Sequence, residues 1–419
     1  MNKIAFLFPG QGSQYTGMGK SLCDAHSIAR ETFEEANDTL GFDLQKLCFE
    51  GDSEELAKTE NTQPAILTLS VAQFRVYKQE LCIEPHYCAG HSLGELSALT
   101  CAGAIEFSDA VKIVRQRGRF MQKAVPIGIG AMAAVTGISR REVEEECGLN
   151  SDESRVVVIA NYNSPEQIVI SGHKEAVNLA ADNLKAKGAK IIPLKVSAPF
   201  HSPLMNPAAE EMREELKKYK FVELKYPVIS NVSARPYVSK ESIPENLKSQ
   251  IISPVRWQES MEFLQRCGVE VVVEMGPKTV LKNLAKRNTP DILAYAYDNN
   301  EDVSSLTDKL KPRNCDSKDS RLKLIVRCLA IAVCTKNKNW DNDKYVAGVV
   351  EPYRRVQELL AELEGNNMEP SLEQLTEALR MLKTVFITKK TDIKEQEERF
   401  KQIFDETGLG HLFRDADFQ

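Results

Sequence analysis

The chain has 419 residues and a formal net charge of −6 at pH 7, with 42% hydrophobic and 27% charged residues. This length exceeds one compact core and predicts two or three domains. The acidic balance argues against a general nucleic-acid binder, and no stretch approaches the ~20 apolar residues of a membrane span. We therefore expect a globular protein with no nucleic-acid and no membrane partner.

The ten cysteines are scattered, without a C-x-x-C pair or a partnering histidine cluster. This pattern argues against a zinc site and against a disulfide framework. Free thiols are typical of a reducing compartment, so we expect a cytoplasmic protein. The apolar stretch that ends at Phe8 is too short for a secretory signal.

The N-terminal region predicts a buried parallel strand followed by a ligand-facing loop. Ile4 to Phe8 is fully apolar, as strands covered on both faces are, and Pro9 to Gln14 is rich in glycine. Loops at the carboxyl ends of parallel strands are where α/β proteins place ligands, although a plain turn is the alternative. No G-K-[ST] follows, so this is not a phosphate loop. Residues 20–82 are predicted to be helical.

A second short strand, ending near Ala89, leads into Gly90-His-Ser-Leu-Gly94, and an alanine-rich stretch follows up to Ala104. G-x-S-x-G is the pattern of a nucleophile elbow. It predicts that the Oγ of Ser92 stands at the start of a helix, where N–H groups stabilise an oxyanion. The simpler alternative is a glycine-containing turn into a helix.

The next predicted helix starts at Ser108 and carries Arg115-Gln-Arg-Gly-Arg119 among apolar positions. At least one of these arginines should lie near the buried side, where a guanidinium needs an anionic partner. A structural ion pair and the binding of an anionic ligand are both compatible with this pattern.

Residues 128–196 predict a compact subdomain. Strand, helix, two strands, helix and strand follow one another, with the Asn161–Pro165 segment joining the two middle strands, and this βαββαβ order is that of a ferredoxin-like unit. The chain then reaches His201, between Pro199 and Pro203. His201 follows a strand end, so it either faces the elbow as a catalytic group or has a structural role.

The C-terminal part changes character. Residues 299–320 are polar and contain Pro312, which predicts a linker. Helices are expected at Leu322–Cys334, Tyr353–Glu364, Leu372–Phe386 and Ile393–Phe404, as in a four-helix bundle. The bundle contains no motif with chemistry, so docking, oligomerisation and a lid function all remain open.

Six separated motifs resemble those of malonyl-CoA:acyl-carrier-protein transacylases and, in the same order, the acyltransferases of polyketide synthases. They are Gly10-Gln-Gly-Ser-Gln14, Gly90-His-Ser-Leu-Gly-Glu95, Arg115-Gln-Arg-Gly118, Asn161-Tyr-Asn-Ser-Pro165, Phe200-His-Ser202 and Gly276-Pro277. The resemblance covers about residues 1–300. It implies an α/β fold with a hydrolase-like parallel-sheet domain (1–127 and 197–298), an inserted ferredoxin-like βαββαβ subdomain (128–196), a linker (299–320) and a C-terminal all-α bundle (321–419).

The resemblance also implies roles for individual residues. Ser92 would carry the acyl group as an ester, and His201 would be the general base and later the general acid. The main-chain carbonyl of Gln250 would orient the imidazole, so no third carboxylate is expected. The main-chain N–H groups of Gln11 and Leu93 would form the oxyanion hole.

The expected acyl-binding residues are Arg117, Phe200, Gln63 and Asn161. Arg117 would bind the free carboxylate of malonate, and an uncharged acyl group would leave it buried without a partner. Phe200 resembles the malonyl-selecting version of its motif. Malonyl-CoA would be the substrate, with no metal and no permanently bound cofactor. The expected partners of this monomer are an acyl carrier protein and coenzyme A.

The C-terminal extension resembles free-standing, trans-acting enzymes of polyketide or lipopeptide assembly lines of the iturin and mycosubtilin kind. The alternatives are malonyl transfer for primary fatty acid synthesis, an editing hydrolase acting on acyl carrier proteins, and a docking protein with an inactive site. Arg117 argues against the hydrolase. A basic face for acidic carriers is expected at Lys278, Lys282, Lys286 and Arg287, unless these form an ordinary solvated helix face.

Overall fold

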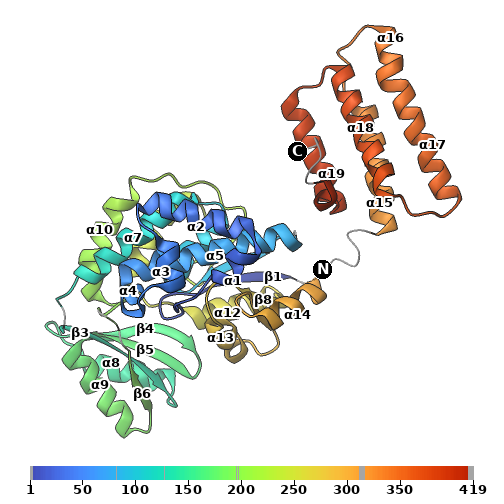
Figure 1. The fold of residues 1–419 in the computed structure, drawn as a ribbon. Helices are drawn as coiled ribbons and strands as arrows, with labels where there is room; N and C mark the ends of the chain where they lie inside the picture. Colours follow the sequence, from blue (N-terminus) through green and yellow to red (C-terminus); the bar gives the residue numbers. More distant parts are fainter. Residues whose placement is uncertain are drawn as a thin grey trace. The chain divides into compact units, whose positions relative to one another are not determined.

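The computed structural model describes residues 3–81, 83–126, 128–194, 196, 198–310 and 317–413 (Figure 1). It divides into two compact units, residues 1–307 and 308–419. The expected domain boundaries at residues 127 and 197 and the expected linker residues 311–316 lie outside the described residues.

A five-stranded parallel sheet organises the first unit. Its order is β7-β2-β1-β8-β9, formed by β7 (Val228–Ile229), β2 (Tyr87–Gly90), β1 (Ile4–Phe8), β8 (Val271–Glu274) and β9 (Leu293–Ala296). All five residues of β1 are buried, as the continuous apolar run predicts for a central parallel strand. The register pairs Phe8 with Gly90, so the loops after β1 and β2 leave the sheet side by side.

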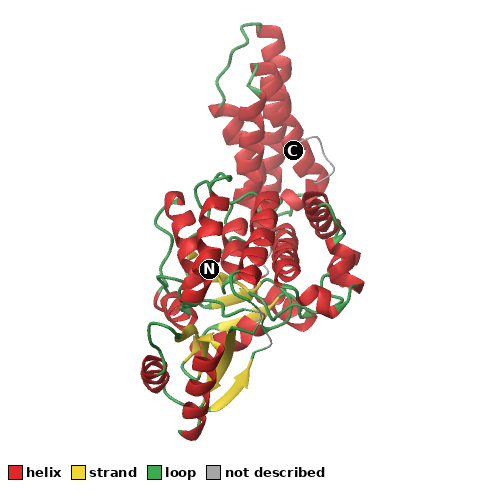
Figure 2. Ribbon diagram, turned by 90° about the vertical axis from the view of Figure 1, so that its left-hand side faces the viewer, coloured by secondary structure: helices red, strands yellow, loops and turns green. Residues whose placement is uncertain are grey.

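Helices cover this sheet on both faces (Figures 1 and 2). They are α1 (Lys20–Ala25), α2 (Ser27–Leu40), α3 (Leu44–Glu50), α4 (Ser53–Ala57), α5 (Thr59–Leu81), α6 (Leu93–Cys101), α7 (Phe107–Lys123), α10 (Asn206–Leu216), α11 (Ile243–Ile252), α12 (Trp257–Arg266), α13 (Val280–Asn288) and α14 (Asn300–Leu310), with the 3-10 turns η1 (Pro203–Met205) and η2 (Lys240–Ser242). One core cluster packs Trp257 and Met261 of α12 against Leu7, Ala89 and Val272 of the sheet. This packing fixes the loops at the carboxyl edge of the sheet.

A second, antiparallel sheet has the order β4-β5-β3-β6. Its elements are β3 (Gly130–Thr136), α8 (Arg140–Leu149), β4 (Val157–Ser164), β5 (Gln167–His173), α9 (Lys174–Ala186) and β6 (Lys190–Pro193). Figure 1 shows both helices on the same face of this sheet. Val135, Ile170, Val177 and Leu184 belong to the core between them.

Two local predictions were wrong. The segment from Asn161 to Ser164, expected as a loop, continues β4 with register shifts, and only Pro165 and Glu166 separate it from β5. The first half of the expected linker is helix α14, since Leu306 and Leu310 are buried and recur at helical spacing. The three residues between the two leucines are polar, so the helical spacing of the leucines was not recognised in the sequence.

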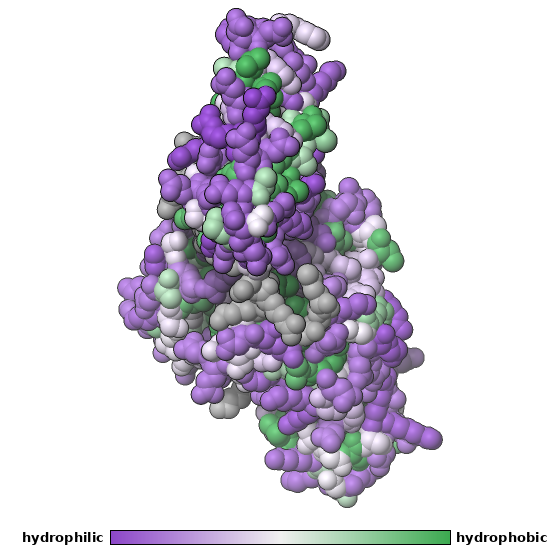
Figure 3. All heavy atoms as spheres, turned by 90° about the vertical axis from the view of Figure 1, so that its right-hand side faces the viewer, coloured by the Kyte–Doolittle hydropathy of each residue, from purple (hydrophilic) through white to green (hydrophobic). Residues whose placement is uncertain are grey.

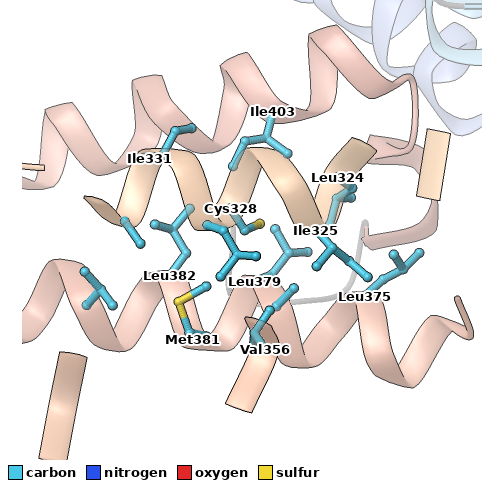
Figure 4. Close-up of a cluster of buried hydrophobic side chains, with 14 of the residues drawn as sticks. Leu324, Ile325, Cys328, Ile331, Val356, Leu375, Leu379, Met381, Leu382 and Ile403 are labelled. Carbon is cyan, nitrogen blue, oxygen red and sulfur yellow. The ribbon is translucent and has the colours of Figure 1, made fainter. Parts of the chain in front are cut away.

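The second unit consists of helices around its own core. They are α15 (Lys318–Cys334), α16 (Asn342–Tyr345), a π-helical turn η3 (Val346–Val350), α17 (Glu351–Gly365), α18 (Leu372–Lys389), α19 (Ile393–Thr407) and the 3-10 turn η4 (Gly410–Phe413). Figure 4 shows Leu324 and Cys328 of α15 facing Leu379 and Leu382 of α18, with Ile403 of α19 on the other side. The four helices expected from the sequence are therefore present and share one apolar core.

The outer surface is mostly polar. Figure 3 shows hydrophilic residues over most of the drawn face, with hydrophobic residues in small separate groups. None of the described helices is long and apolar enough to cross a membrane. Eight cysteines lie in the described part of the chain, and all eight are free.

Candidate active site

The elbow forms where β2 ends at Gly90 and α6 begins at Leu93. Ser92 lies between them with φ 52° and ψ −107°, a conformation that non-glycine residues rarely adopt. A Cβ on Gly90 would come 1.9 Å from the main chain of Gly94, and a Cβ on Gly94 would come 1.9 Å from the carbonyl oxygen of Phe8. Both glycines are therefore required by the close approach of the strand, the turn and the helix.

Ser92 and His201 form a hydrogen-bonded pair. The Oγ of Ser92 lies 2.8 Å from Nε2 of His201, and Nδ1 of the same ring lies 2.9 Å from the main-chain oxygen of Gln250 in α11. A carbonyl oxygen only accepts, so Nδ1 carries the ring proton and Nε2 is the acceptor that faces the serine hydroxyl. The structure thus brings together the serine, the histidine and the main-chain carbonyl that the resemblance implies.

The three arginines of α7 have different partners. Arg115 and Arg119 both form ion pairs with Glu60, at 3.4 and 2.9 Å. Arg117 is only 1% exposed and donates to Oε1 of Gln63 at 3.0 Å. In the described part of the chain, no carboxylate bonds to Arg117, and its Nε has no partner.

Arg117 also reaches the nucleophile. Its Nη2 donates to the Oγ of Ser92 at 3.2 Å and to Oε1 of Gln250 at 2.9 Å. Burial lowers the pKa of Arg117 to about 10, so the guanidinium remains charged at neutral pH. A buried cation with only neutral partners is suited to receive an anionic ligand next to the serine.

Burial, followed by the charge of Arg117, lowers the pKa of His201 to about 3. The imidazole is therefore neutral at pH 7, and its Nε2 is free to accept a hydrogen bond from the serine hydroxyl. The neighbouring His91 does not join this pair. Its Nε2 lies 2.9 Å from Oδ1 of Asn163, and burial lowers its pKa as well.

The loop after β1 lies against the elbow. A Cβ on Gly10 would come 2.5 Å from the main-chain oxygen of His91, so this loop approaches the serine turn closely. The side chain of Gln11 donates to Thr59, 3.4 Å away. Within the described residues, the main-chain N–H groups of Gln11 and Leu93 donate to no protein acceptor. Two main-chain donors, one in the loop after β1 and one at the start of α6, are therefore available to a ligand.

The remaining expected site residues divide into two groups. Gln63 contacts Arg117, and Phe200 is buried beside His201 in the chain. The residues that hydrogen bonds link around the serine are Ser92, His201, Arg117, Gln63 and Gln250, called the Ser92 cluster below. Asn161 is also buried, but it lies in β4, where its main chain pairs with Val255, and no hydrogen bond joins it to this cluster.

Three buried polar groups of this site were missed by the sequence analysis: Glu95, Asn231 and the side-chain amide of Gln250. Glu95 accepts from Gln250 Nε2 at 2.7 Å and from the main-chain N–H of Asn231 at 3.1 Å. The available signal was a carboxylate within the apolar run after Ser92, since such a group must be paired when buried.

The expected basic face is only partly present. Lys278 precedes α13 and donates to the main-chain oxygen of Gln14, and Lys282 pairs with Asp302. The prediction of a four-residue face was wrong, because Lys278 lies outside the helix and Lys282 is half-buried in its ion pair with Asp302 of α14. Lys286 and Arg287 are exposed, and Arg287 lines a groove with Lys187 and Lys190. Over the described residues, no group of three or more His, Cys, Asp or Glu side chains is placed to hold a metal ion.

A serine at a strand-to-helix elbow, paired with a neutral histidine at the carboxyl edge of a parallel sheet, is typical of the α/β enzymes that form an acyl ester on the serine, hydrolases and acyl transferases alike. The chain belongs to the acyl transferase domain family, whose sequence profile matches residues 5–312.

Curated relatives agree with this assignment. A malonyl CoA-acyl carrier protein transacylase of Bacillus subtilis is 42% identical over 396 residues, which is 94% of this chain and 99% of the relative. One of Escherichia coli K12 is 47% identical over 297 residues, covering 71% of this chain and 96% of the relative.

Solved structures match the first unit. A crystal structure of an acyl carrier protein S-malonyltransferase from Vibrio cholerae has a TM-score of 0.71 and 42% identity, covering 73% of this chain and 99% of that one. A malonyl-transacylase in complex with a type II PKS acyl-carrier protein also has a TM-score of 0.71 and 42% identity, with the same coverage of both chains.

Proposed function

We propose that the chain transfers a malonyl group from malonyl-CoA to the phosphopantetheine thiol of an acyl carrier protein. The relatives and solved structures named for this reaction support the proposal. The observation that carries it is the position of Arg117, a buried cation 3.2 Å from the Oγ of Ser92. A group whose free carboxylate carbon lies two bonds from the reacting carbonyl carbon, as in malonyl, would meet both residues at once.

In the first half-reaction, the Oγ of Ser92 attacks the thioester carbonyl while His201 Nε2 takes the hydroxyl proton. The carbonyl oxygen becomes an oxyanion that the N–H groups of Gln11 and Leu93 stabilise. The carbon–sulfur bond then breaks, and the coenzyme A sulfur leaves with the proton from His201. The acyl group remains as an ester on Ser92.

The second half-reaction reverses these steps with a different thiol. His201 takes the proton of the carrier thiol, whose sulfur attacks the ester, and returns the proton to Ser92 as the ester bond breaks. Arg117 holds the acyl carboxylate throughout, with Gln63 positioning its guanidinium. Phe200 and Asn161 complete the acyl pocket in this proposal, and Phe200 excludes a branched α-carbon.

Incubation with malonyl-CoA tests the function directly. A stable mass increase of one malonyl group is expected on the peptide that contains Ser92. Absence of this adduct, or an adduct that forms at the same rate from acetyl-CoA, would contradict the proposal. Comparison of hydrolysis with transfer on a loaded carrier distinguishes it from an editing hydrolase.

We further propose that the first unit combines a hydrolase-like domain with a ferredoxin-like subdomain at 128–196, and that the bundle is a separate module. The antiparallel order β4-β5-β3-β6 supports the subdomain. In this proposal the enzyme is a cytoplasmic monomer that serves a polyketide or lipopeptide assembly line. Support comes from the relative that matches 94% of the chain, bundle included, and from the neighbour solved with a PKS carrier. Transfer to fatty-acid and assembly-line carriers, compared side by side, tests the pathway.

A further inference from the structure

Glu95 is a fully buried carboxylate beneath the elbow, three residues after Ser92. Its Oε2 accepts from Gln250 Nε2 at 2.7 Å and from the main-chain N–H of Asn231 at 3.1 Å, and its Oε1 accepts from the hydroxyl of Tyr237. In the described part of the chain, no cation bonds directly to Glu95. A buried charge in this setting requires a second charge close by.

Two of the residues that bond to Glu95, Asn231 and Gln250, also hold the main chain of Ser92. Oδ1 of Asn231 accepts from the N–H of Ser92 at 2.7 Å, and Nε2 of Gln250 donates to the main-chain oxygen of Ser92 at 2.9 Å. Backbone in a rarely populated conformation persists only where its surroundings enforce it. One carboxylate oxygen therefore anchors both groups that enforce the serine turn.

Glu95 also fixes which way the Gln250 amide points. Both hydrogens of its Nε2 are used, one on Glu95 and one on the main-chain oxygen of Ser92. The amide oxygen consequently faces Nη2 of Arg117 at 2.9 Å. The reverse orientation would place N–H groups against a guanidinium and an oxygen against a carboxylate.

Glu95 and Arg117 are thus opposite charges separated by one amide. A carboxylate bonded directly to Arg117 would compete with the carboxylate of an acyl group for the same donors. Behind the amide, the charge of Glu95 offsets that of Arg117 while leaving the guanidinium available.

We propose that Glu95 is a positioning residue for acyl selection, which holds Ser92 and Arg117 in place through Gln250 and Asn231. This inference rests on the proposed malonyl transfer. Glu95 touches neither the substrate nor the reacting atoms.

The charge of Glu95 changes near neutral pH. The groups that act on it are Arg117 of α7 and Tyr237 of the segment after β7, and burial raises the pKa of Glu95 to about 7. Selection for malonyl over acetyl should therefore increase as the pH rises through this value, because only the ionised carboxylate accepts from all three donors and so fixes the Gln250 amide against Arg117.

The test measures the initial rates of Ser92 acylation in the full chain with malonyl-CoA and with acetyl-CoA, within about one pH unit on either side of 7. For Glu95→Gln, the malonyl-to-acetyl rate ratio is expected to fall about tenfold and to lose its pH dependence. For Tyr237→Phe, the rise in the ratio is expected to move to higher pH, since Glu95 loses a donor that favours its charged form.

Glu274→Gln is the matched control. Glu274 is equally buried, and burial raises its pKa to about 8, but it accepts from the N–H groups of Leu281 and Lys282 and bonds to no member of the Ser92 cluster. This variant should lose stability and keep the wild-type ratio and pH course.

An unchanged ratio in Glu95→Gln, or an equal loss with both acyl groups, would overturn the inference and leave Glu95 a structural residue. If that variant does not fold, an unshifted pH course in Tyr237→Phe overturns it. A wild-type chain that forms no malonyl-Ser92 contradicts the proposed function itself, before any variant is compared.

Discussion

Ser92 and His201 face each other at 2.8 Å, and both have positive φ angles, 52° and 57°. Positive φ costs an ordinary L-residue free energy that the rest of the fold must offset. In this site, the positive φ of Ser92 directs its Oγ away from the start of α6, and the positive φ of His201 directs Nε2 toward that Oγ. Ser92 and His201 are 109 residues apart in the chain, so the fold brings two distant segments together.

Arg117→Ala should change which acyl group Ser92 accepts. Loss of a buried charge partner costs about 3–5 kcal/mol, so kcat/KM for malonyl-CoA is expected to fall by roughly two to four orders of magnitude relative to acetyl-CoA. Arg119→Ala is the control, because Arg119 lies on the same helix and pairs with Glu60. If Arg117→Ala and Arg119→Ala prefer malonyl-CoA over acetyl-CoA to the same extent, Arg117 does not take part in acyl recognition.

Gly94→Ala should abolish acylation of Ser92 and lower the melting temperature. The added Cβ would meet the carbonyl oxygen of Phe8 at 1.9 Å, and because its neighbours there are main-chain atoms, no side-chain rotation relieves the clash. Gly148→Ala is the control, since that Cβ points into open space in α8 and should stabilise the helix slightly. Thermal unfolding and mass spectrometry of the Ser92 peptide measure both effects, and a fully acylated Gly94→Ala would refute this requirement.

His201 should make folding sensitive to acid. Its pKa is about 3 in the folded chain and about 6.5 when unfolded, so between these values only the unfolded chain takes up the proton. Stability is therefore lost as the pH falls from the higher value toward the lower one.

His201→Gln removes this contribution. The free energy of unfolding of the variant should gain about 1.4 kcal/mol per pH unit relative to wild type as the pH falls through this window. Urea titrations at several pH values measure it. Ser92→Ala keeps the histidine and should retain the wild-type slope, and parallel slopes in wild type and His201→Gln would contradict the low pKa.

Removal of the residues after Leu310 should leave acylation of Ser92 at the wild-type rate. Every group of the Ser92 cluster lies in the first unit, and the bundle has a core of its own. The released fragment from Ser317 onward should remain helical by circular dichroism. Transfer to the cognate carrier, measured with and without the bundle, then reports the contribution of the bundle. Loss of acylation on truncation would show that the two units depend on each other.

Much of the site could be predicted because its chemistry lies in local patterns. The two glycines around Ser92 are required by local geometry, and the α7 period places Arg117 on the buried side. The sequence left open whether this arginine had a carboxylate partner. The hydrogen bonds of Arg117 resolve that question, since its partners in the described part of the chain are all neutral, while Glu60 of α5 pairs with Arg115 and Arg119.

The buried polar cluster could not be predicted in the same way. Glu95, Asn231 and the amide of Gln250 come from three distant segments, and only the fold shows that each satisfies the others.

Helix α14 was missed in the sequence for a different reason. Its apolar residues are few and are spaced among charged ones, so composition suggested a linker where burial of Leu306 and Leu310 produces a helix.

The hydrogen bond between His201 and residue 250 uses a main-chain oxygen, which every amino acid provides. No point mutation can delete that acceptor, although a mutation can shift it. Acyl recognition, in contrast, depends on side chains such as Arg117 that a single codon change replaces. A substitution at Arg117 can therefore alter the acyl group that is accepted without removing the main-chain oxygen that orients the imidazole.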